Sequence, residues 1–176
     1  MVKLNISDEI LAEIGKIVVI HSLVEESLAS IIGTIISLKT RHELGQVVTA
    51  ELSFRQLIST LNSLLILCLG KEHECTIDFE RIKKLLYDAE VQRNQVAHSL
   101  WAKHDESGSQ VVLRIKTTAK EKVGLRREFT KLDIVEIRKI TASVADAYLA
   151  LCIFELRFQK DDPAMNEQLD SYQANL

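Results

Sequence analysis

The sequence predicts a mostly α-helical bundle with a small β-hairpin inserted before the last long helix. The 176 residues include only six glycines and one proline, so few positions force a helix to end. Apolar residues recur at spacings of three and four over several long segments, which is the period of a helix with one buried face. Between residues 98 and 116, two short strand-like stretches instead flank a turn-forming segment.

The length and the 47% hydrophobic content suit one core, so we expect a single domain over residues 1–160. Residues 161–176 hold four acids and no Lys or Arg, and we expect an acidic, flexible tail there. The formal net charge of -3 gives no global attraction to nucleic acid, which leaves room only for a local basic surface.

We expect a soluble, cytoplasmic protein. The first residues lack a basic stretch followed by an apolar run and a cleavage site, so nothing indicates secretion. The longest apolar tracts, residues 17–20 and 64–69, are far shorter than the ~20 residues of a membrane span, so we expect no membrane partner. Three cysteines without a CxxC pair favour a reducing compartment over a disulfide framework.

Metal and cofactor sites are not expected. Cys68, His73 and Cys75 lie near one another in sequence, but their spacing matches no standard zinc knuckle and a fourth ligand is missing. We therefore interpret these cysteines and Cys152 as packed or idle thiols.

The first helix should begin after Ser7, whose side chain can cap it, with Asp8 and Glu9 in its first turn. One apolar face continues to about residue 38, and it consists of Ile10, Ile14, Ile17, His21, Val24, Leu28, Ile31 and Ile35. A face this broad indicates a bundle core, or a core plus a dimer interface. His21 within it is either a catalytic imidazole or a satisfied core or interface histidine, and we favour the second interpretation.

The middle of the chain predicts three helices. One spans residues 41–52 or is broken near Gly45. The next runs from Ser53 to Leu69 and stops at Gly70. After the polar link 71–76, another helix is marked by Phe79, Ile82, Leu85, Leu86, Ala89 and Val96.

The predicted hairpin pairs residues 98–104 with 110–116 across a turn at 105–109, and residues 125–129 are a possible third strand. The last helix should start near Leu132, with Asp133 in its first turn, and end before Pro163. Its apolar face consists of Ile134, Ile137, Ile140, Val144, Ala147, Leu151, Phe154 and Phe158.

The predicted fourth helix ends with the one motif whose side chains suggest a specific chemistry, Arg93-Asn94-Gln-Val-Ala-His98. At helical spacing Glu90, Asn94 and His98 share a stripe, and Arg93 lies three residues after Glu90, so we expect the four polar groups to converge. Arginine suits phosphate oxygens and histidine exchanges protons near neutral pH, so the set suits phosphodiester chemistry. Asn94 would orient the imidazole or a phosphate oxygen, and Glu90 would hold Arg93 until substrate competes for it.

This segment resembles the R-x4-6-H signature of HEPN domains, in which a polar residue, often Asn, follows the Arg. The resemblance implies an α-helical, commonly dimeric fold and a metal-independent endoribonuclease of a toxin, antiphage or RNA-processing system. It assigns the catalytic role to Arg93, Asn94 and His98 alone. In a homodimer, two Arg/His pairs would supply a base, an acid and charge stabilisation for attack by a ribose 2′-OH.

Further residues are candidates for substrate binding. Trp101 could stack on a base, although a core role is favoured for an aromatic residue in a hairpin. Residues 114–131 have a local charge of +5, and Arg114, Lys116, Arg126 and Arg127 could follow a nucleic-acid backbone. Charged edge strands also prevent aggregation, and the two interpretations weigh equally.

The leading hypothesis is therefore a HEPN-like ribonuclease or RNA-binding homodimer, with an antitoxin or another protein as a further partner. The alternative is a non-catalytic helical domain for protein interaction or nucleotide binding. In that case Arg93 and His98 bond to the last carbonyls of their helix or to Glu25 or Glu26 across the bundle.

Overall fold

The computed structural model describes residues 6–37, 42–98, 100–103, 112–120 and 124–160, and it divides into two compact units. The sheet-bearing unit comprises residues 1–21 and 88–145, and the helical unit comprises residues 22–87 and 146–176. Three helices contribute residues to both units. The predicted turn at 105–109 and the acidic tail 161–176 lie outside the described residues. A single domain over residues 1–160 stays a prediction.

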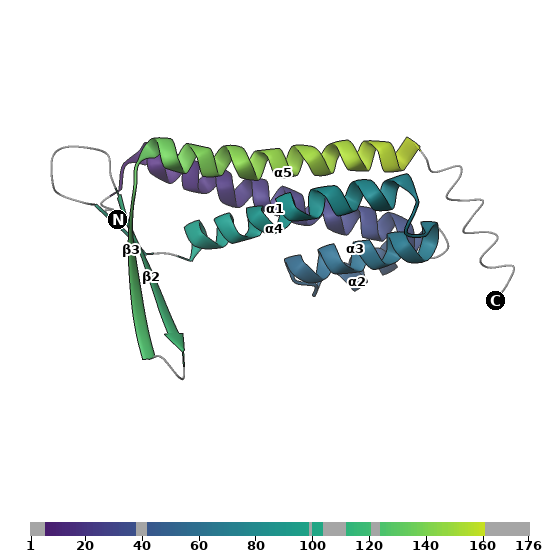
Figure 1. Ribbon diagram of the computed structural model, residues 1–176, viewed down its shortest axis with the longest axis horizontal. Helices are drawn as coiled ribbons and strands as arrows, with labels where there is room; N and C mark the ends of the chain where they lie inside the picture. The colour runs from purple at the N-terminus through teal and green to yellow at the C-terminus, as the bar shows by residue number, and fades with distance from the viewer. Residues whose placement is uncertain (1–5, 38–41, 99, 104–111, 121–123, 161–176) are drawn as a thin grey trace, which may run out of the picture. The chain divides into compact units, whose positions relative to one another are not determined.

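The fold class is mostly α, with the strands placed before the last long helix, as predicted (Figure 1). The elements in chain order are α1 (Asp8–Ser37), α2 (His42–Thr49), α3 (Phe54–Leu69), α4 (Glu74–Ala97), β1 (Leu100–Lys103), β2 (Val112–Lys120), β3 (Gly124–Leu132) and α5 (Ile134–Lys160). The second helix continues through Gly45 without a break, and the fourth begins inside the link that was predicted to be polar coil.

Local capping explains most of these boundaries. The Ser7 hydroxyl accepts a hydrogen bond from the Ile10 amide at 3.4 Å, where α1 begins. At α3, the Gln56 side chain accepts from the Ser53 amide at 2.8 Å, and Gly70, with a φ of 90°, ends the helix.

The start of α5 has a reciprocal cap. Asp133 accepts a hydrogen bond from the Glu136 amide at 2.8 Å, and the Glu136 carboxylate accepts from the Asp133 amide at 2.9 Å. The helix therefore starts one residue later than Asp133, which caps it instead of lying in its first turn.

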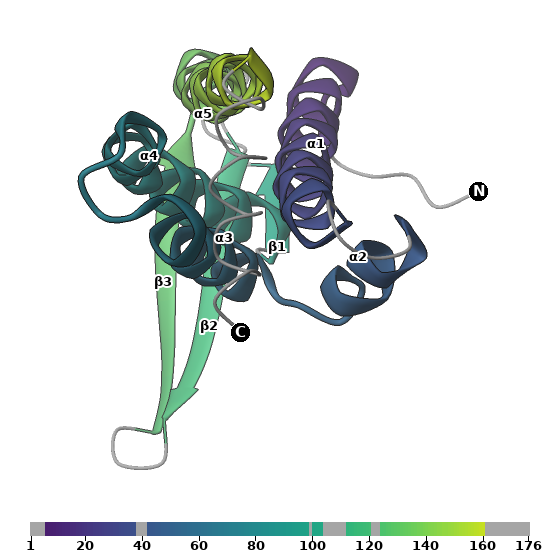
Figure 2. The same cartoon turned by 90° about the vertical axis from the view of Figure 1, so that its right-hand side faces the viewer.

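The strands form one antiparallel sheet in the order β1-β2-β3. Leu100 pairs with Ile115 between β1 and β2, which confirms the predicted pairing of these segments, and Lys116 pairs with Glu128 between β2 and β3. The possible third strand is real and is longer than residues 125–129 because its whole length pairs with β2 (Figure 2). Local sequence does not reveal where a pairing partner ends, so the strand boundary was wrong.

Packing in the sheet-bearing unit joins the first residues of α1 to the later part of α4 and the start of α5. Its buried apolar side chains on the described helices are Ile10, Ile17, Ala89, Val96, Ile137 and Val144. Ile14 was expected to be buried on this face of α1 and is half-buried. Glu13 is buried in its place and is only 6% exposed. Its carboxylate accepts hydrogen bonds from Lys16 at 2.7 Å and Thr141 at 2.8 Å. These two hydrogen bonds hold the pKa of Glu13 below its ordinary value of 4.5.

The helical unit has an apolar and aromatic core. The rings of Phe79 and Phe154 lie 5.4 Å apart, and those of Phe154 and Phe158 lie 6.0 Å apart. Among the described side chains, the buried aliphatic ones come from α1, α3, α4 and α5, and they include Val24, Leu28, Ile31, Ile58, Leu61, Leu65, Leu86 and Leu151. Leu85 was predicted to lie on the buried face of α4 and is 43% exposed, because Leu86 occupies the core position instead.

Over Asp8–Ile36, α1 is long and apolar enough to cross a membrane. The core helix of a soluble protein passes the same test of length and composition, and so does a signal sequence near the N-terminus. The alternating three- and four-residue spacing of its buried side chains is typical of a core helix.

Candidate functional site

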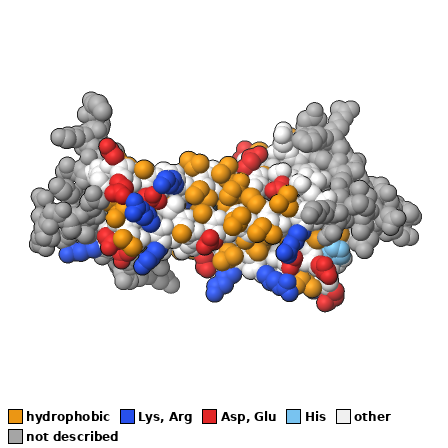
Figure 3. Space-filling view, turned by 90° about the horizontal axis from the view of Figure 1, so that it is seen from above, with side chains coloured by type: hydrophobic (Ala, Val, Ile, Leu, Met, Phe, Trp, Pro, Cys, Tyr) orange, Lys and Arg blue, Asp and Glu red, His pale blue; other side chains and the backbone are white. Residues whose placement is uncertain are grey.

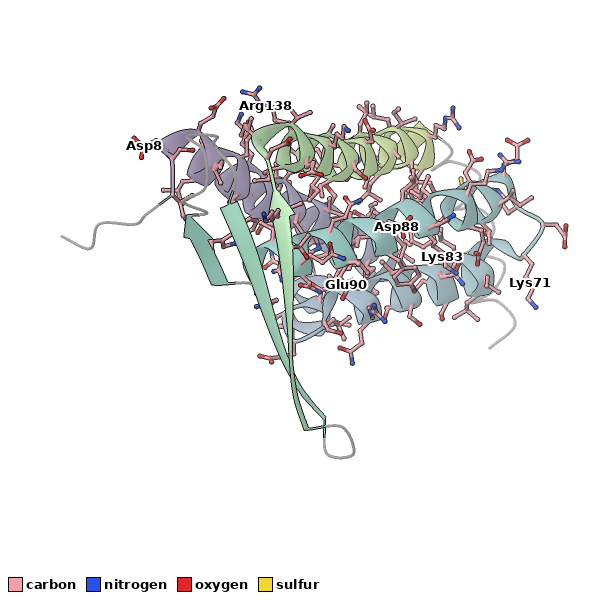
Figure 4. All side chains as sticks on the ribbon, turned by 60° about the vertical axis from the view of Figure 1, so that its left-hand side comes forward. Asp8, Lys71, Lys83, Asp88, Glu90 and Arg138 are labelled. Carbon is pink, nitrogen blue, oxygen red and sulfur yellow. The ribbon has the colours of Figure 1, made fainter. Side chains whose placement is uncertain are left out.

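The Arg93–His98 motif occupies the C-terminal end of α4. The His98 amide donates to the Asn94 carbonyl at 3.2 Å, so the helical hydrogen-bond pattern continues through this residue. The His98 side chain is exposed beyond the last turn. Glu90 is half-buried two turns earlier on the same helix (Figure 4). The motif therefore presents its imidazole to solvent at a helix terminus.

Arg93 is more enclosed than His98. Its Nη1 donates to the Asn94 side-chain oxygen at 2.9 Å, and both side chains are half-buried. Its Nε is buried and makes no hydrogen bond within the described part of the chain. An amide oxygen that holds the guanidinium in this way fixes the direction of its remaining N–H groups.

Helical geometry separates Arg93 from His98. Five residues correspond to about 1.4 turns, so the two side chains leave α4 about 140° apart. Glu90, Asn94 and His98, at spacings of four, do share one stripe. A single α4 helix therefore directs the guanidinium and the imidazole to different sides, and the predicted convergence of all four groups does not follow from the helix alone.

His21 belongs to the same unit as Arg93. It is 1% exposed on α1, which confirms its burial in the core, whereas a hydrogen-bonded partner for its ring stays a prediction. Burial lowers its pKa to about 4, and the positive charge of Arg93 contributes to the decrease. At neutral pH this imidazole is uncharged. Sequence reasoning identified His21, but its electrostatic coupling to the motif depends on packing between α1 and α4 and was missed.

Trp101 connects β1 to the end of α4 by a hydrogen bond. Its indole Nε1 donates to the Val96 carbonyl at 3.0 Å, and the ring is half-buried. Val96 is in the last turn of α4, so this bond satisfies a carbonyl that has no partner within the helix. The contact supports a positioning role for Trp101 at the point where α4 leads into β1. Base stacking stays a prediction.

The basic segment forms the paired strands β2 and β3. In the register, Arg114 lies opposite Thr130, and Lys116 lies opposite Glu128. Arg126 and Arg127 lie opposite Thr118 and Thr117. The side chains of these four basic residues lie outside the described part of the structure, so the prediction that they bind nucleic acid remains open.

The residues considered as metal ligands have a structural use. His73 Nδ1 accepts a hydrogen bond from the Cys75 amide at 3.2 Å, so the imidazole caps the first turn of α4. Cys75 is buried, Cys68 and Cys152 are half-buried, and none of the three forms a disulfide with another described residue. Among the described residues, no three His, Cys, Asp or Glu side chains group in a way that could hold a metal ion.

A cavity in the helical unit was not predicted. It lies between α1 and α2 and has a volume of about 690 Å³. Its wall on α1 includes Ser22, Glu26, Ala29 and Gly33, which recur at spacings of three and four. That pattern is the polar and small-residue face opposite the buried stripe, and it was the available sequence signal.

Comparison of the chain with protein-family models, with curated proteins and with solved structures gives no match.

Proposed function

We propose that this protein is a metal-independent endoribonuclease that acts as a homodimer in the cytoplasm, with a toxin or antiphage system as its biological setting. The observation that carries the proposal is the end of α4, where an Arg93–Asn94 side-chain pair precedes an exposed His98. Guanidinium and imidazole groups are the two side chains that phosphodiester cleavage without a metal needs most.

The helical separation of Arg93 and His98 favours a site built from two chains. With the two groups about 140° apart around α4, one copy cannot easily direct both to a single phosphate. A second copy would supply the complementary pair, and a two-fold arrangement brings identical motifs together. Under the proposal, each phosphate is therefore contacted by residues of both protomers.

Self-association is supported by an exposed apolar stripe on α5. Leu149, Ile153 and Leu156 are 58%, 45% and 61% exposed, and their spacing places them on one side of the helix. Figure 3 shows hydrophobic side chains gathered in the middle of one face. Contiguous apolar surface of this kind marks protein interfaces more often than solvated surface.

The proposed reaction is an in-line attack of a ribose 2′-OH on the adjacent phosphorus. One His98 imidazole removes the hydroxyl proton, and the protonated His98 of the second copy gives a proton to the departing 5′-oxygen. Arg93 stabilises the charge that builds on the phosphorane, and Asn94 holds the guanidinium. The products are a 2′,3′-cyclic phosphate and a 5′-hydroxyl.

Cleavage of mixed RNAs in EDTA tests the activity. Wild-type protein should cleave RNA and leave cyclic phosphate ends, and His98→Ala should lose roughly 100-fold or more in rate. Arg93→Lys keeps a positive charge but removes the planar fork, so it should also lose activity. Lys84→Ala, at an exposed position on the same helix, is the matched control. Intact RNA with wild type, or equal cleavage by all variants of equal stability, would reject the enzyme.

Light scattering tests the dimer. Wild type should have a mass near twice 19.9 kDa. Ile153→Asp should give monomers and lose RNA cleavage, whereas Val47→Asp on α2, which is 71% exposed, should change neither property. A monomeric, fully active wild type would contradict the composite site.

The second candidate function is a non-catalytic helical domain that binds a protein partner or a nucleotide. It is favoured by the partial burial of Arg93 and by the Trp101–Val96 hydrogen bond. Both indicate that the motif region contributes to the stability of the fold. In that case Arg93→Lys lowers stability without any RNA cleavage to lose, and an antitoxin or another protein replaces RNA as the partner.

A further inference from the structure

Hydrogen bonds hold the backbone on both sides of His98. The His98 amide donates to the Asn94 carbonyl at 3.2 Å, which keeps the last turn of α4 helical. The Val96 carbonyl has no amide partner within the helix and accepts from the Trp101 indole Nε1 at 3.0 Å. Val96 precedes His98 and Trp101 follows it, so this bond joins the chain across the motif histidine. Val96 is 1% exposed, so water does not readily replace the indole.

Trp101 is itself held by the sheet. It lies opposite Arg114 in the register of β1 and β2, next to Leu100, which lies opposite Ile115. These residues and the end of α4 belong to the sheet-bearing unit. Because antiparallel pairing holds the β1 backbone, the indole connects a paired strand with the last turn of α4.

The side chain that depends on this connection is the imidazole of His98. It is exposed, so packing around it does not set its direction, and its place follows from the backbone that carries it. Asn94 links it to Arg93, because the Asn94 carbonyl accepts from the His98 amide while its side-chain oxygen accepts from Arg93 Nη1 at 2.9 Å. A shift of the last turn of α4 would therefore displace the imidazole and change the contact that holds the guanidinium.

We propose that Trp101 is a positioning residue for His98, and that it acts through the hydrogen bond from its indole to the Val96 carbonyl. The catalytic consequence rests on the proposed ribonuclease, in which His98 exchanges a proton with RNA. A displacement of about 1 Å at a catalytic group can cost roughly 100-fold in rate, so a hydrogen bond that fixes such a group has a large kinetic effect. This role differs from base stacking, in which the face of the ring, and not its N–H group, would contact RNA.

Replacement of the indole N–H tests the kinetic role. Trp101 is the only tryptophan in the chain, so an analogue supplied in place of tryptophan changes this residue alone. Benzothienylalanine has sulfur where tryptophan has N–H and keeps nearly the same shape, whereas fluorotryptophan keeps the N–H and is the matched control. In EDTA the benzothienylalanine protein should lose about tenfold or more in kcat for RNA cleavage, with a KM within about twofold of wild type. The fluorotryptophan protein should match wild type.

A second control separates positioning from loss of stability. The Val96 carbonyl loses its partner in the benzothienylalanine protein, so the thermal midpoint should fall by about 2–10 °C. Ile137→Val, at a buried position of the same unit, also lowers the midpoint but does not touch the indole bond. It should keep the kcat of wild type when cleavage is measured below the unfolding transitions of all the proteins.

The order of the His98 backbone is measured without RNA. Backbone amide relaxation should give His98 an order parameter of about 0.85 in wild type and in the fluorotryptophan protein, and about 0.6 in the benzothienylalanine protein. The amide of Glu90, two turns earlier on α4, should keep the same value in all three proteins.

With an active wild type, an unchanged kcat or an unchanged His98 order parameter in the benzothienylalanine protein would overturn the inference. Base stacking would overturn it too, and its sign would be a raised KM in Trp101→Ala beside normal cleavage by the benzothienylalanine protein. Intact RNA with wild type would reject the ribonuclease instead, and the order parameter would then decide alone whether Trp101 holds His98 in place.

Discussion

The two units of this chain differ in the kind of polar side chain that each one buries. In the sheet-bearing unit, the buried polar groups are titratable, namely Glu13 and His21. In the helical unit, they are the hydroxyls of Thr49 and Thr76, and each donates to a backbone carbonyl. A buried group that titrates makes stability depend on pH, whereas a bonded hydroxyl does not. The comparison applies to the described residues of each unit.

The difference has a physical consequence for function. The positive charge of Arg93, in the candidate site, helps to keep the buried His21 neutral. The aromatic cluster of the helical unit has no such electrostatic link and stabilises by burial and ring packing. We therefore expect acid to affect the sheet-bearing unit first, and loss of packing volume to affect the helical unit most.

The largest expected effect is that of Phe154→Ala. Phe154 is 3% exposed and its ring contacts those of Phe79 and Phe158, so truncation should cost about 3–5 kcal/mol of unfolding free energy. Urea unfolding at pH 7 and pH 5 should give the same loss, because no charge is involved. Leu156→Ala, two residues away and 61% exposed, should cost less than about 0.5 kcal/mol. Equal losses in the two variants would contradict the described core.

The next effect is an acid-side loss of stability that depends on His21. Its pKa is 6.5 in an unfolded chain and about 4 in the fold. Below pH 6.5 the unfolded chain therefore binds a proton that the fold does not, and stability falls until about pH 4. The loss of unfolding free energy is at most about 3 kcal/mol, and at pH 7 the titration of His21 makes no contribution to it.

Substitution of His21 separates this loss from other titrations. Urea unfolding between pH 7 and pH 5 should show a decline in wild type that is smaller in both His21→Gln and His21→Leu. Glu13 acts in the same direction but at lower pH, because its lowered pKa makes its contribution disappear as pH falls below 4.5. Parallel curves for wild type and both variants would show that His21 is not buried in a neutral form.

The smallest effect tests the backbone contact in the helical unit. Gly33 on α1 and Gly45 on α2 approach so closely that Gly45→Ala places a Cβ 2.5 Å from the Gly33 Cα, and it should cost about 1–3 kcal/mol of stability. Gly33→Ala meets its nearest atom, the Gly45 Cα, at 3.8 Å, so it should be neutral or stabilising by up to about 1 kcal/mol through helix propensity. Thermal unfolding compares the pair. Equal destabilisation by the two would show that the helices are farther apart.

Much of the candidate site depended on information that local sequence does not contain. The Arg93–Asn94–His98 spacing was visible, and it placed the motif at a helix end, as the structure does. The coupling of His21 to Arg93 was not visible, because residues 72 apart in sequence come together only through packing of α1 and α4. The Gly33–Gly45 contact was missed for the same reason, since Gly45 was considered only as a point where the helix over residues 41–52 could break.

The sequence by itself determined the helices and their caps, because helical period and capping act within four residues of each position. Ser53 and Gly70 stand at the helix boundaries where they were expected, and Asp133 caps the last helix one residue before the first turn in which it was expected. Only the tertiary structure decided the length of β3, the burial of Glu13 in place of Ile14, and the cavity between α1 and α2. Each of these depends on which distant surface a residue meets, and that is a property of packing.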